Sequence, residues 1–106
     1  MNAKDREILN RLKTLLQTKV KLYRIILFGS RARGDAEPES DMDILVILDG
    51  PRTKEAMRSV SDCAWEVGFD EGVIIVPIVV SRRDWEEGSD KESLLAKVIQ
   101  EEGVQG

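Results

Sequence analysis

The chain has 106 residues, of which 42% are hydrophobic and 34% charged, and its formal net charge is −4. This length suits one globular domain over residues 1–106, and the acidic balance argues against direct binding to nucleic acid. Histidine is absent and Cys63 is the only cysteine, which excludes histidine-dependent catalysis and a disulfide within the chain. Any metal must bind oxygen ligands, and a reducing cytoplasm is the expected compartment.

The first half of the chain predicts a helix and two strands. Apolar residues recur at spacings of three and four over residues 4–19, which predicts an amphipathic helix. Residues 22–29 predict a strand ending at Gly29, and residues 30–40 predict a loop with a short helical turn at its start. Residues 41–50 predict a second strand, whose uninterrupted apolar segment is typical of a strand covered on both faces.

The second half predicts three helices and one strand. Residues 53–68 predict a helix, and residues 72–81 predict a strand in which Pro77 indicates a sheet edge or a bulge. Short helices are expected at 83–87 and from about 90 to 101, and the tail is expected to fray. This order predicts an α/β (α+β) domain, with helices packed against a small mixed β-sheet. No apolar run is long enough to cross a membrane.

Two aspartates, Asp41 and Asp43, stand at the start of the second strand. Alternation of side chains along a strand places both on one face, about 7 Å apart. Two like charges there repel each other unless a cation or water screens them. Asp-x-Asp is a common tripeptide, so two solvated surface residues are the simple explanation. A divalent cation would reverse the sign of the interaction, and Mg²⁺ commonly takes two carboxylates together with substrate phosphates.

The Gly-Ser turn before this loop favours the metal explanation. Gly29 permits close approach of the backbone, and the amides of Ser30 and Arg31 suit an anion-binding concavity. The Ser30 hydroxyl can donate to a phosphate oxygen, and Arg31 and Arg33 can neutralise further negative charge. The turn and Asp41 meet at one sheet edge only if the two strands are antiparallel. Such an edge would carry a nucleoside triphosphate site.

The segment GSRARGDAEPESDMD, residues 29–43, resembles the signature of the polymerase-beta-like nucleotidyltransferase superfamily, in the form typical of its minimal nucleotidyltransferases. The resemblance implies that Asp41 and Asp43 hold two Mg²⁺ ions, with Mn²⁺ as an alternative, and are catalytic. It implies NTP binding, with ATP as the expected nucleotide. The residues it assigns to nucleotide binding or to shaping that loop are Gly29, Ser30, Arg31, Arg33 and Ser40.

One part of the family pattern is missing. The family carries a third carboxylate on the next core strand, where it serves as metal ligand and general base. The matching position here falls near Ile74 or Ile75, and neither is acidic. Asp70 and Glu71 lie just before that strand and would reach the site only if the register shifted. The gap bears on catalysis more than on nucleotide binding, because loss of a general base costs roughly 10²- to 10⁴-fold in rate.

The resemblance also implies a protein partner. Small nucleotidyltransferases of this kind are often paired with a helical HEPN-domain protein, an RNA-cleaving toxin, which the transferase neutralises by binding it or by adding AMP to it. No acceptor-binding domain is expected in this chain, so the acceptor would come from another protein. Two functions stay open: a nucleotidyltransferase, and a catalytically inactive module that works by occlusion. An antibiotic-modifying enzyme is disfavoured, and a homo-oligomer stays open.

Two tryptophans are predicted to pack inside the protein rather than to stack on a base. Trp65 is placed on the inward face of the second long helix, and Trp85 follows the third strand. Large aromatic side chains contribute heavily to core packing. Cys63 is expected to be a small, partly buried residue without a chemical role.

Overall fold

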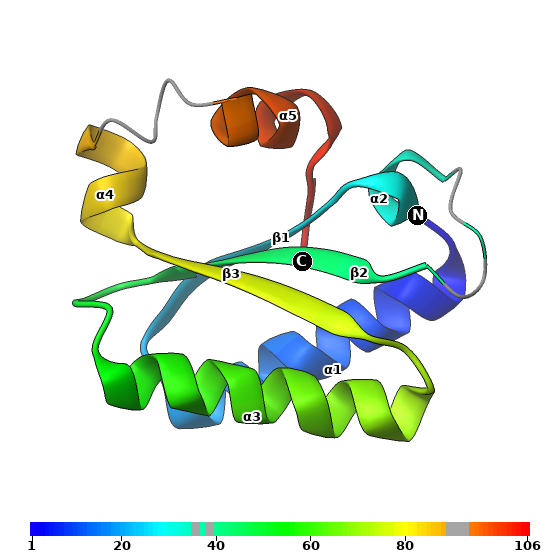
Figure 1. Cartoon of the computed structure of the whole chain (residues 1–106), viewed down its shortest axis with the longest axis horizontal. Helices are drawn as coiled ribbons and strands as arrows, with labels where there is room; N and C mark the ends of the chain where they lie inside the picture. The colour runs from blue at the N-terminus through cyan, green and yellow to red at the C-terminus, as the bar shows by residue number, and fades with distance from the viewer. Residues whose placement is uncertain (35–36, 38–39, 89–93) are drawn as a thin grey trace.

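The fold contains five helices and four strands in the described part of the chain (Figure 1). The computed structural model describes residues 1–34, 37, 40–88 and 94–106. In chain order the elements are α1 (Ala3–Lys19), β1 (Leu22–Phe28), α2 (Ser30–Arg33), β2 (Met42–Leu48), α3 (Lys54–Glu71), β3 (Ile75–Ser81), α4 (Arg82–Glu87), α5 (Leu94–Glu102) and β4 (Val104–Gln105). The predicted element order is confirmed as far as α5, although the start expected for that helix lies outside the described residues; the short strand β4 was not predicted.

The sheet is mixed, as predicted, with strand order β3-β2-β1-β4. Strand β1 is antiparallel to β2 and to β4, whereas β2 and β3 are parallel. Strand β2 lies inside the sheet and its residues from Ile44 to Leu48 are buried, which confirms the prediction of a strand covered on both faces. Strand β3 lies at an edge, where Pro77 disrupts no second ladder.

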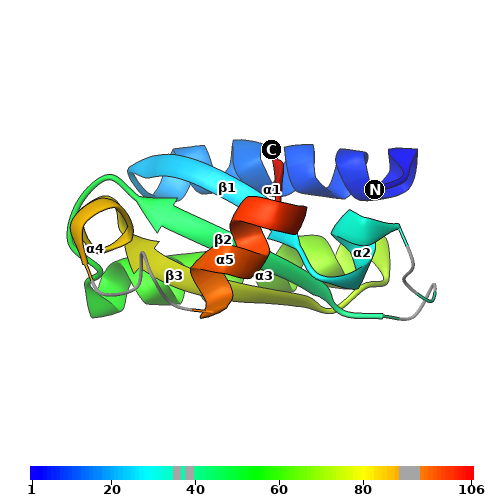
Figure 2. The ribbon, with the colours of Figure 1, turned by 90° about the horizontal axis from the view of Figure 1, so that it is seen from above.

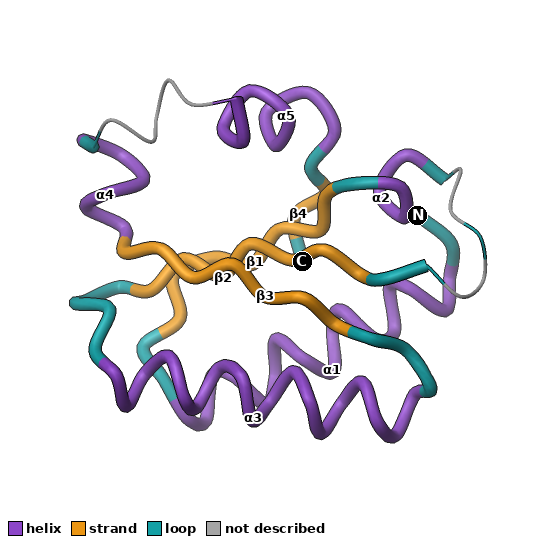
Figure 3. Tube along the Cα trace, in the orientation of Figure 1, coloured by secondary structure: helices purple, strands orange, loops and turns teal. Residues whose placement is uncertain are grey.

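Helices α1 and α3 cover one face of the sheet, and α4 and α5 lie over the other (Figures 1, 2 and 3). Alternate β2 side chains, such as Met42 and Ile44, pack into the larger core under α1 and α3. Leu45 and Ile47 point the other way and pack with Ile99 of α5 in a second, smaller core. The start of β2 therefore presents Met42 to the larger core and Asp43 to the opposite face.

The C-terminal residues are ordered in a strand, so the expectation of a frayed tail was wrong. Val104 pairs with Leu27 and Gln105 pairs with Ile26, which covers the second edge of β1. The amide of Gly106 donates to the carbonyl of Ile25 at 2.9 Å. This strand could not be predicted from sequence, because two residues are too few to show the alternation that marks a strand.

The two tryptophans differ in their environment. Trp85 is half-buried and packs against the smaller core, as predicted. Trp65 is 69% exposed, so its predicted packing inside the protein was wrong. The residues of α3 that face the core include Ala64 and Val67, and each residue turns a helix by about 100°. Trp65 therefore points away from the sheet, where its ring stacks on Phe69 with centroids 5.1 Å apart.

Candidate nucleotide and metal site

The Gly-Ser turn reverses the chain directly after β1. Gly29 has φ 80° and ψ −159°, a backbone conformation that is essentially reserved for glycine. Its carbonyl accepts from the amide of Arg33 at 3.1 Å, and the carbonyl of Ser30 accepts from Gly34 at 3.0 Å. These two bonds form the short helix α2, which is the helical turn expected at the start of the loop.

Strand pairing brings this turn against Asp43. The strands β1 and β2 are antiparallel, as the site hypothesis requires, and Phe28 pairs with Asp43. A β-carbon added to Gly29 would stand 2.7 Å from Oδ2 of Asp43. The carboxylate therefore occupies the space that any other residue at position 29 would need. The turn and the aspartate, 14 positions apart in sequence, form one surface at the α2 end of the sheet.

The two aspartates interact electrostatically. Asp43 is half-buried and Asp41 is exposed, with the fully buried Met42 between them. Partial loss of water raises the pKa of the Asp43 carboxyl above its ordinary value, and the negative charge of Asp41 raises it further. A cation bound to both carboxylates would offset both effects.

The donor set suits a hard divalent cation. Two carboxylates are the protein ligands that Mg²⁺ commonly takes, with the remaining positions filled by phosphate oxygens and water. Within the described residues, no group of three or more histidine, cysteine or acidic side chains could hold a metal by itself. Asp41 and Asp43 therefore fit a metal that arrives with a polyphosphate better than a permanently bound structural ion.

The predicted phosphate contacts of the two arginines stay predictions, and both guanidinium groups bind protein groups in this structure. Arg31 is buried, pairs with Asp5 of α1 at 2.7 Å and donates to the carbonyl of Ser40. Arg33 pairs with Glu102 of α5 at 2.9 Å. Ser40 takes part in the loop through its carbonyl, which accepts from Arg31, and its expected roles in shaping the turn and in binding nucleotide stay predictions.

The strand register shows what stands in place of a third carboxylate. Asp43 pairs with Val76 on β3, and the carbonyl of Ile74 accepts from the amide of Met42 at 2.8 Å. Ile74 and Val76 are exposed, whereas Ile75 points into the larger core. The position opposite Asp43 is therefore Val76, one residue beyond Ile75, the later of the two expected positions, and it carries no acid.

The shifted register that would bring Asp70 or Glu71 into the site is not realised. Both residues end α3 and form ion pairs with α1: Asp70 with Arg11, and Glu71 with Arg11 and Lys4. These contacts lie in the layer of α1 and α3, on the face of the sheet opposite Asp43. They hold the two helices together.

The sequence analysis did not single out Asp5, although a signal was present. Asp5 is 3% exposed and its carboxylate binds Arg31. It stands three residues before Ile8 and four before Leu9, so it continues the apolar stripe of α1. An acidic residue on the buried face of a helix needs a buried cation, and Arg31 provides it.

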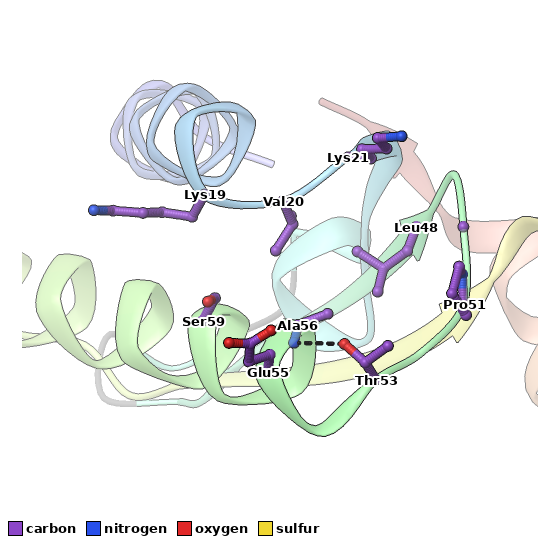
Figure 4. Close-up of a pocket in the computed structure, with 10 residues that line it drawn as sticks. Lys19, Val20, Lys21, Leu48, Pro51, Thr53, Glu55, Ala56 and Ser59 are labelled. Atoms are coloured by element: carbon purple, nitrogen blue, oxygen red, sulfur yellow. Dashed lines mark hydrogen bonds between the residues drawn. The ribbon is translucent and has the colours of Figure 1, made fainter.

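A cavity of about 420 Å³ lies at the other end of the sheet (Figure 4). It is lined by the end of β2 at Leu48 and the start of α3, where the Thr53 hydroxyl accepts from the amide of Ala56 at 3.0 Å. Neither Asp43 nor the Gly-Ser turn lines it. The candidate site is therefore an open surface beside α2 rather than this cavity.

Comparison with known proteins identifies the family of the chain. Residues 6–104 match the family described as nucleotidyltransferase domain. A Methanocaldococcus jannaschii protein named as a protein adenylyltransferase is 35% identical over 78 residues, which cover 72% of this chain and 79% of the relative. The protein adenylyltransferase MntA of Haemophilus influenzae is 42% identical over 62 residues, which cover 52% of this chain and 54% of the relative.

Solved structures share the fold. One chain of a toxin–antitoxin crystal structure with AMP-PNP matches with a TM-score of 0.66 and 23% identity, over 91% of this chain and 69% of that chain. A chain of the Shewanella oneidensis complex of a tri-AMPylated HEPN toxin with its MNT antitoxin matches with a TM-score of 0.61 and 20% identity, over 94% and 69%. The match across almost all of the sequence shows that this chain belongs to the nucleotidyltransferase domain family.

Proposed function

We propose that the protein binds ATP with Mg²⁺ at the α2 end of the sheet and transfers AMP to a hydroxyl group of a partner protein. In this proposal the Gly29–Ser30 turn receives the phosphates, and Asp41 and Asp43 hold the metal. The contact between Gly29 and the Asp43 carboxylate is the observation that supports it most strongly. It brings the Gly29–Ser30 turn and the Asp43 carboxylate side by side.

The reaction forms one bond and breaks one. The acceptor hydroxyl oxygen would bond to the α-phosphorus, and the bond from that phosphorus to the oxygen bridging to the β-phosphate would break. Pyrophosphate would leave with the electron pair, and the hydroxyl proton would pass to solvent. When bound, Mg²⁺ would supply charge stabilisation to the attacking and leaving oxygens. The chain's own contribution is to hold the phosphates and the two carboxylates in a fixed relation.

A HEPN-domain protein is the proposed partner. Relatives of this chain are named protein adenylyltransferases, and structural neighbours are antitoxins seen with a HEPN toxin. An apolar patch at the β3 edge also favours a protein acceptor; Trp65, Phe69 and Ile74 line one surface hollow there, and Val76, two residues beyond Ile74, is also exposed. Exposed clusters of large apolar side chains are typical of protein interaction surfaces. Because Val76 pairs with Asp43, a protein seated on this patch would contact the edge of the site.

Occlusion without catalysis is the second candidate function. Val76 stands opposite Asp43, where a third carboxylate would be needed, and among the described residues no third acidic side chain groups with Asp41 and Asp43 as a metal site. Such a protein would still bind the nucleotide and the partner through the same surfaces. The observation lowers the expected rate of transfer by roughly 10²- to 10⁴-fold and leaves the binding functions intact.

Labelled ATP distinguishes these two functions. The chain would be mixed with [α-³²P]ATP, Mg²⁺ and a purified HEPN-domain protein encoded beside it. Label that moves to the partner, and is lost with Asp43→Asn but not with Asp49→Asn, supports the transferase. Asp49 is a suitable control because it is an exposed aspartate at the other end of β2. Nucleotide binding and complex formation without transfer would support occlusion, and absence of Mg²⁺-dependent ATP binding would overturn both.

A further inference from the structure

A buried ion pair connects α1 to the loop that carries the candidate site. Asp5 is 3% exposed and Arg31 is 8% exposed. The distance from Nη1 of Arg31 to Oδ1 of Asp5 is 2.7 Å. Asp5 is itself fixed, because its amide donates to the side chain of Asn2, the N-cap of α1, at 2.7 Å. The carboxylate therefore comes from a well-anchored helix end.

The guanidinium group of Arg31 also binds the backbone directly before Asp41. Nε and Nη2 of Arg31 donate to the carbonyl of Ser40 at 3.0 and 2.6 Å. Ser40 directly precedes Asp41, and Arg31 directly follows Ser30. The Arg31 side chain thus joins the two ends of the loop that runs from the Gly29–Ser30 turn to Asp41. The planar fork of arginine permits this, because its donors can serve a carboxylate and a carbonyl at once.

We propose that Asp5 and Arg31 are positioning residues for the Mg²⁺–nucleotide site, holding Asp41 at a fixed place relative to the Gly29–Ser30 turn. Arg31 acts in this proposal through the backbone of Ser40 and not by contact with a phosphate. Asp5 pairs with the guanidinium and orients it inside the protein, where an unpaired cation would be unfavourable. The inference rests on the proposed nucleotide site, since it assigns these two residues a role in that site.

An alternative role is purely structural: the pair would stabilise the fold and nothing else. The double variant Asp5→Leu/Arg31→Met separates the two roles. Replacing both members of a buried ion pair by apolar residues of similar size commonly restores stability, but methionine has no N–H group to hold the Ser40 carbonyl. We expect the double variant to unfold at a urea midpoint near that of the unmodified protein.

Two measurements on that variant test the proposal. Without nucleotide, amide hydrogen exchange at residues 41–43 should rise at least tenfold, while exchange along β3 stays unchanged. With Mg²⁺ and AMP-PNP, affinity measured by calorimetry should fall about 10- to 100-fold, the usual effect of losing a partner that orients a metal ligand. Arg11→Met is the matched control, since it removes another arginine–carboxylate contact of α1 away from the site.

The outcomes separate this inference from the proposed function. A stable double variant with unchanged exchange at residues 41–43 would overturn the positioning role. Unchanged affinity for Mg²⁺ and AMP-PNP would do the same. If the unmodified protein fails to bind AMP-PNP, the proposed function fails, yet the exchange measurement still tests whether Arg31 fixes the backbone at Asp41. If the double variant does not fold, the same exchange and affinity measurements are made on Arg31→Lys. Lysine keeps the positive charge but lacks the planar guanidinium group that binds Asp5 and the Ser40 carbonyl together.

Discussion

The Oδ2 atom of Asp43 lies 2.7 Å from the point where a β-carbon on Gly29 would stand. No real β-carbon sits that close to a carboxylate oxygen, so a side chain at position 29 must displace Asp43. The backbone at Gly29, with φ 80° and ψ −159°, adds a second barrier. The end of β1 and the start of β2 are therefore built around the absence of a side chain at Gly29.

We predict that Gly29→Ala weakens binding of Mg²⁺ and AMP-PNP at least tenfold. It should also lower the free energy of unfolding by about 1–3 kcal/mol, the usual cost of a strained backbone. Calorimetry and urea unfolding measure the two effects. Gly72→Ala is the control: its φ is 72° and nothing lies within 4 Å of an added β-carbon. It should cost about 1–2 kcal/mol and leave binding unchanged; equal losses of binding would contradict the geometry.

The pairing of Glu71 with α1 predicts a pH dependence of stability. The hydrogen bond from Lys4, followed by that from Arg11, lowers the pKa of Glu71 below its ordinary value of 4.5. A carboxylate whose pKa is lower in the folded state contributes stability above its unfolded pKa and loses that contribution as the pH falls through the folded value. The unmodified protein should therefore be more stable than Glu71→Gln at pH 7.

The difference between these two proteins should shrink steadily as the pH is lowered below 4.5. Urea midpoints measured at several pH values provide the test. Glu7→Gln serves as the control because its contact with Lys4, at 4.0 Å, joins two exposed side chains. A gap between the unmodified protein and Glu71→Gln that stays constant from pH 7 to pH 3 would show that the ion pairs of Glu71 do not contribute in solution.

Parts of this structure follow from local patterns in the sequence. The apolar run after Asp43 predicts a covered strand, and the glycine before Ser30 predicts a tight turn, because each is a property of neighbouring residues. The antiparallel pairing of β1 with β2 follows from the short loop between them. These local features predict that Gly29 and Asp43 lie at one edge of the sheet, and the structure places them there.

Other parts depend on contacts between distant residues. The register of β3 against β2 decides that Val76, rather than Ile74 or Ile75, stands opposite Asp43, and nothing within β3 encodes it. The contact of Arg31 with Asp5 joins residues 26 positions apart. A motif alone favours a phosphate contact for Arg31, since an arginine near a phosphate turn is expected to be solvent-facing. Only the folded arrangement reveals its internal partners.

The two tryptophans should respond differently to truncation. Trp65 is 69% exposed and touches Phe69, so Trp65→Ala should change the free energy of unfolding by less than about 1 kcal/mol. Trp85 packs against the smaller core between α4 and the sheet, so Trp85→Ala should cost about 2 kcal/mol or more. Urea unfolding of the two variants compares them directly.

Fluorescence gives an independent check on the same assignment. In Trp85→Phe only Trp65 emits, and acrylamide should quench it efficiently. In Trp65→Phe the remaining Trp85 should be quenched less, because the smaller core shields part of its ring. Similar quenching of both variants, together with a large loss of stability in Trp65→Ala, would mean that another surface covers Trp65 in solution.

The crowding of Asp41 and Asp43 predicts that the site opposes folding when no metal is present. Partial burial and the charge of Asp41 raise the pKa of Asp43, so ionised Asp43 is less stable in the folded protein than in the unfolded chain. Without Mg²⁺, Asp43→Asn should therefore stabilise the protein, by about 1 kcal/mol or less. Asp49→Asn should shift the stability by less than about 0.5 kcal/mol, because Asp49 is exposed.

Addition of Mg²⁺ and AMP-PNP should reverse the order. Ligands that bind only the folded state stabilise it, so the unmodified protein and Asp49→Asn should gain in melting temperature while Asp43→Asn should not. Thermal unfolding with and without the ligands measures both effects on the same samples. If Asp43→Asn melts below the unmodified protein without metal, Asp43 makes favourable contacts in the folded state that outweigh its lost hydration and the repulsion from Asp41.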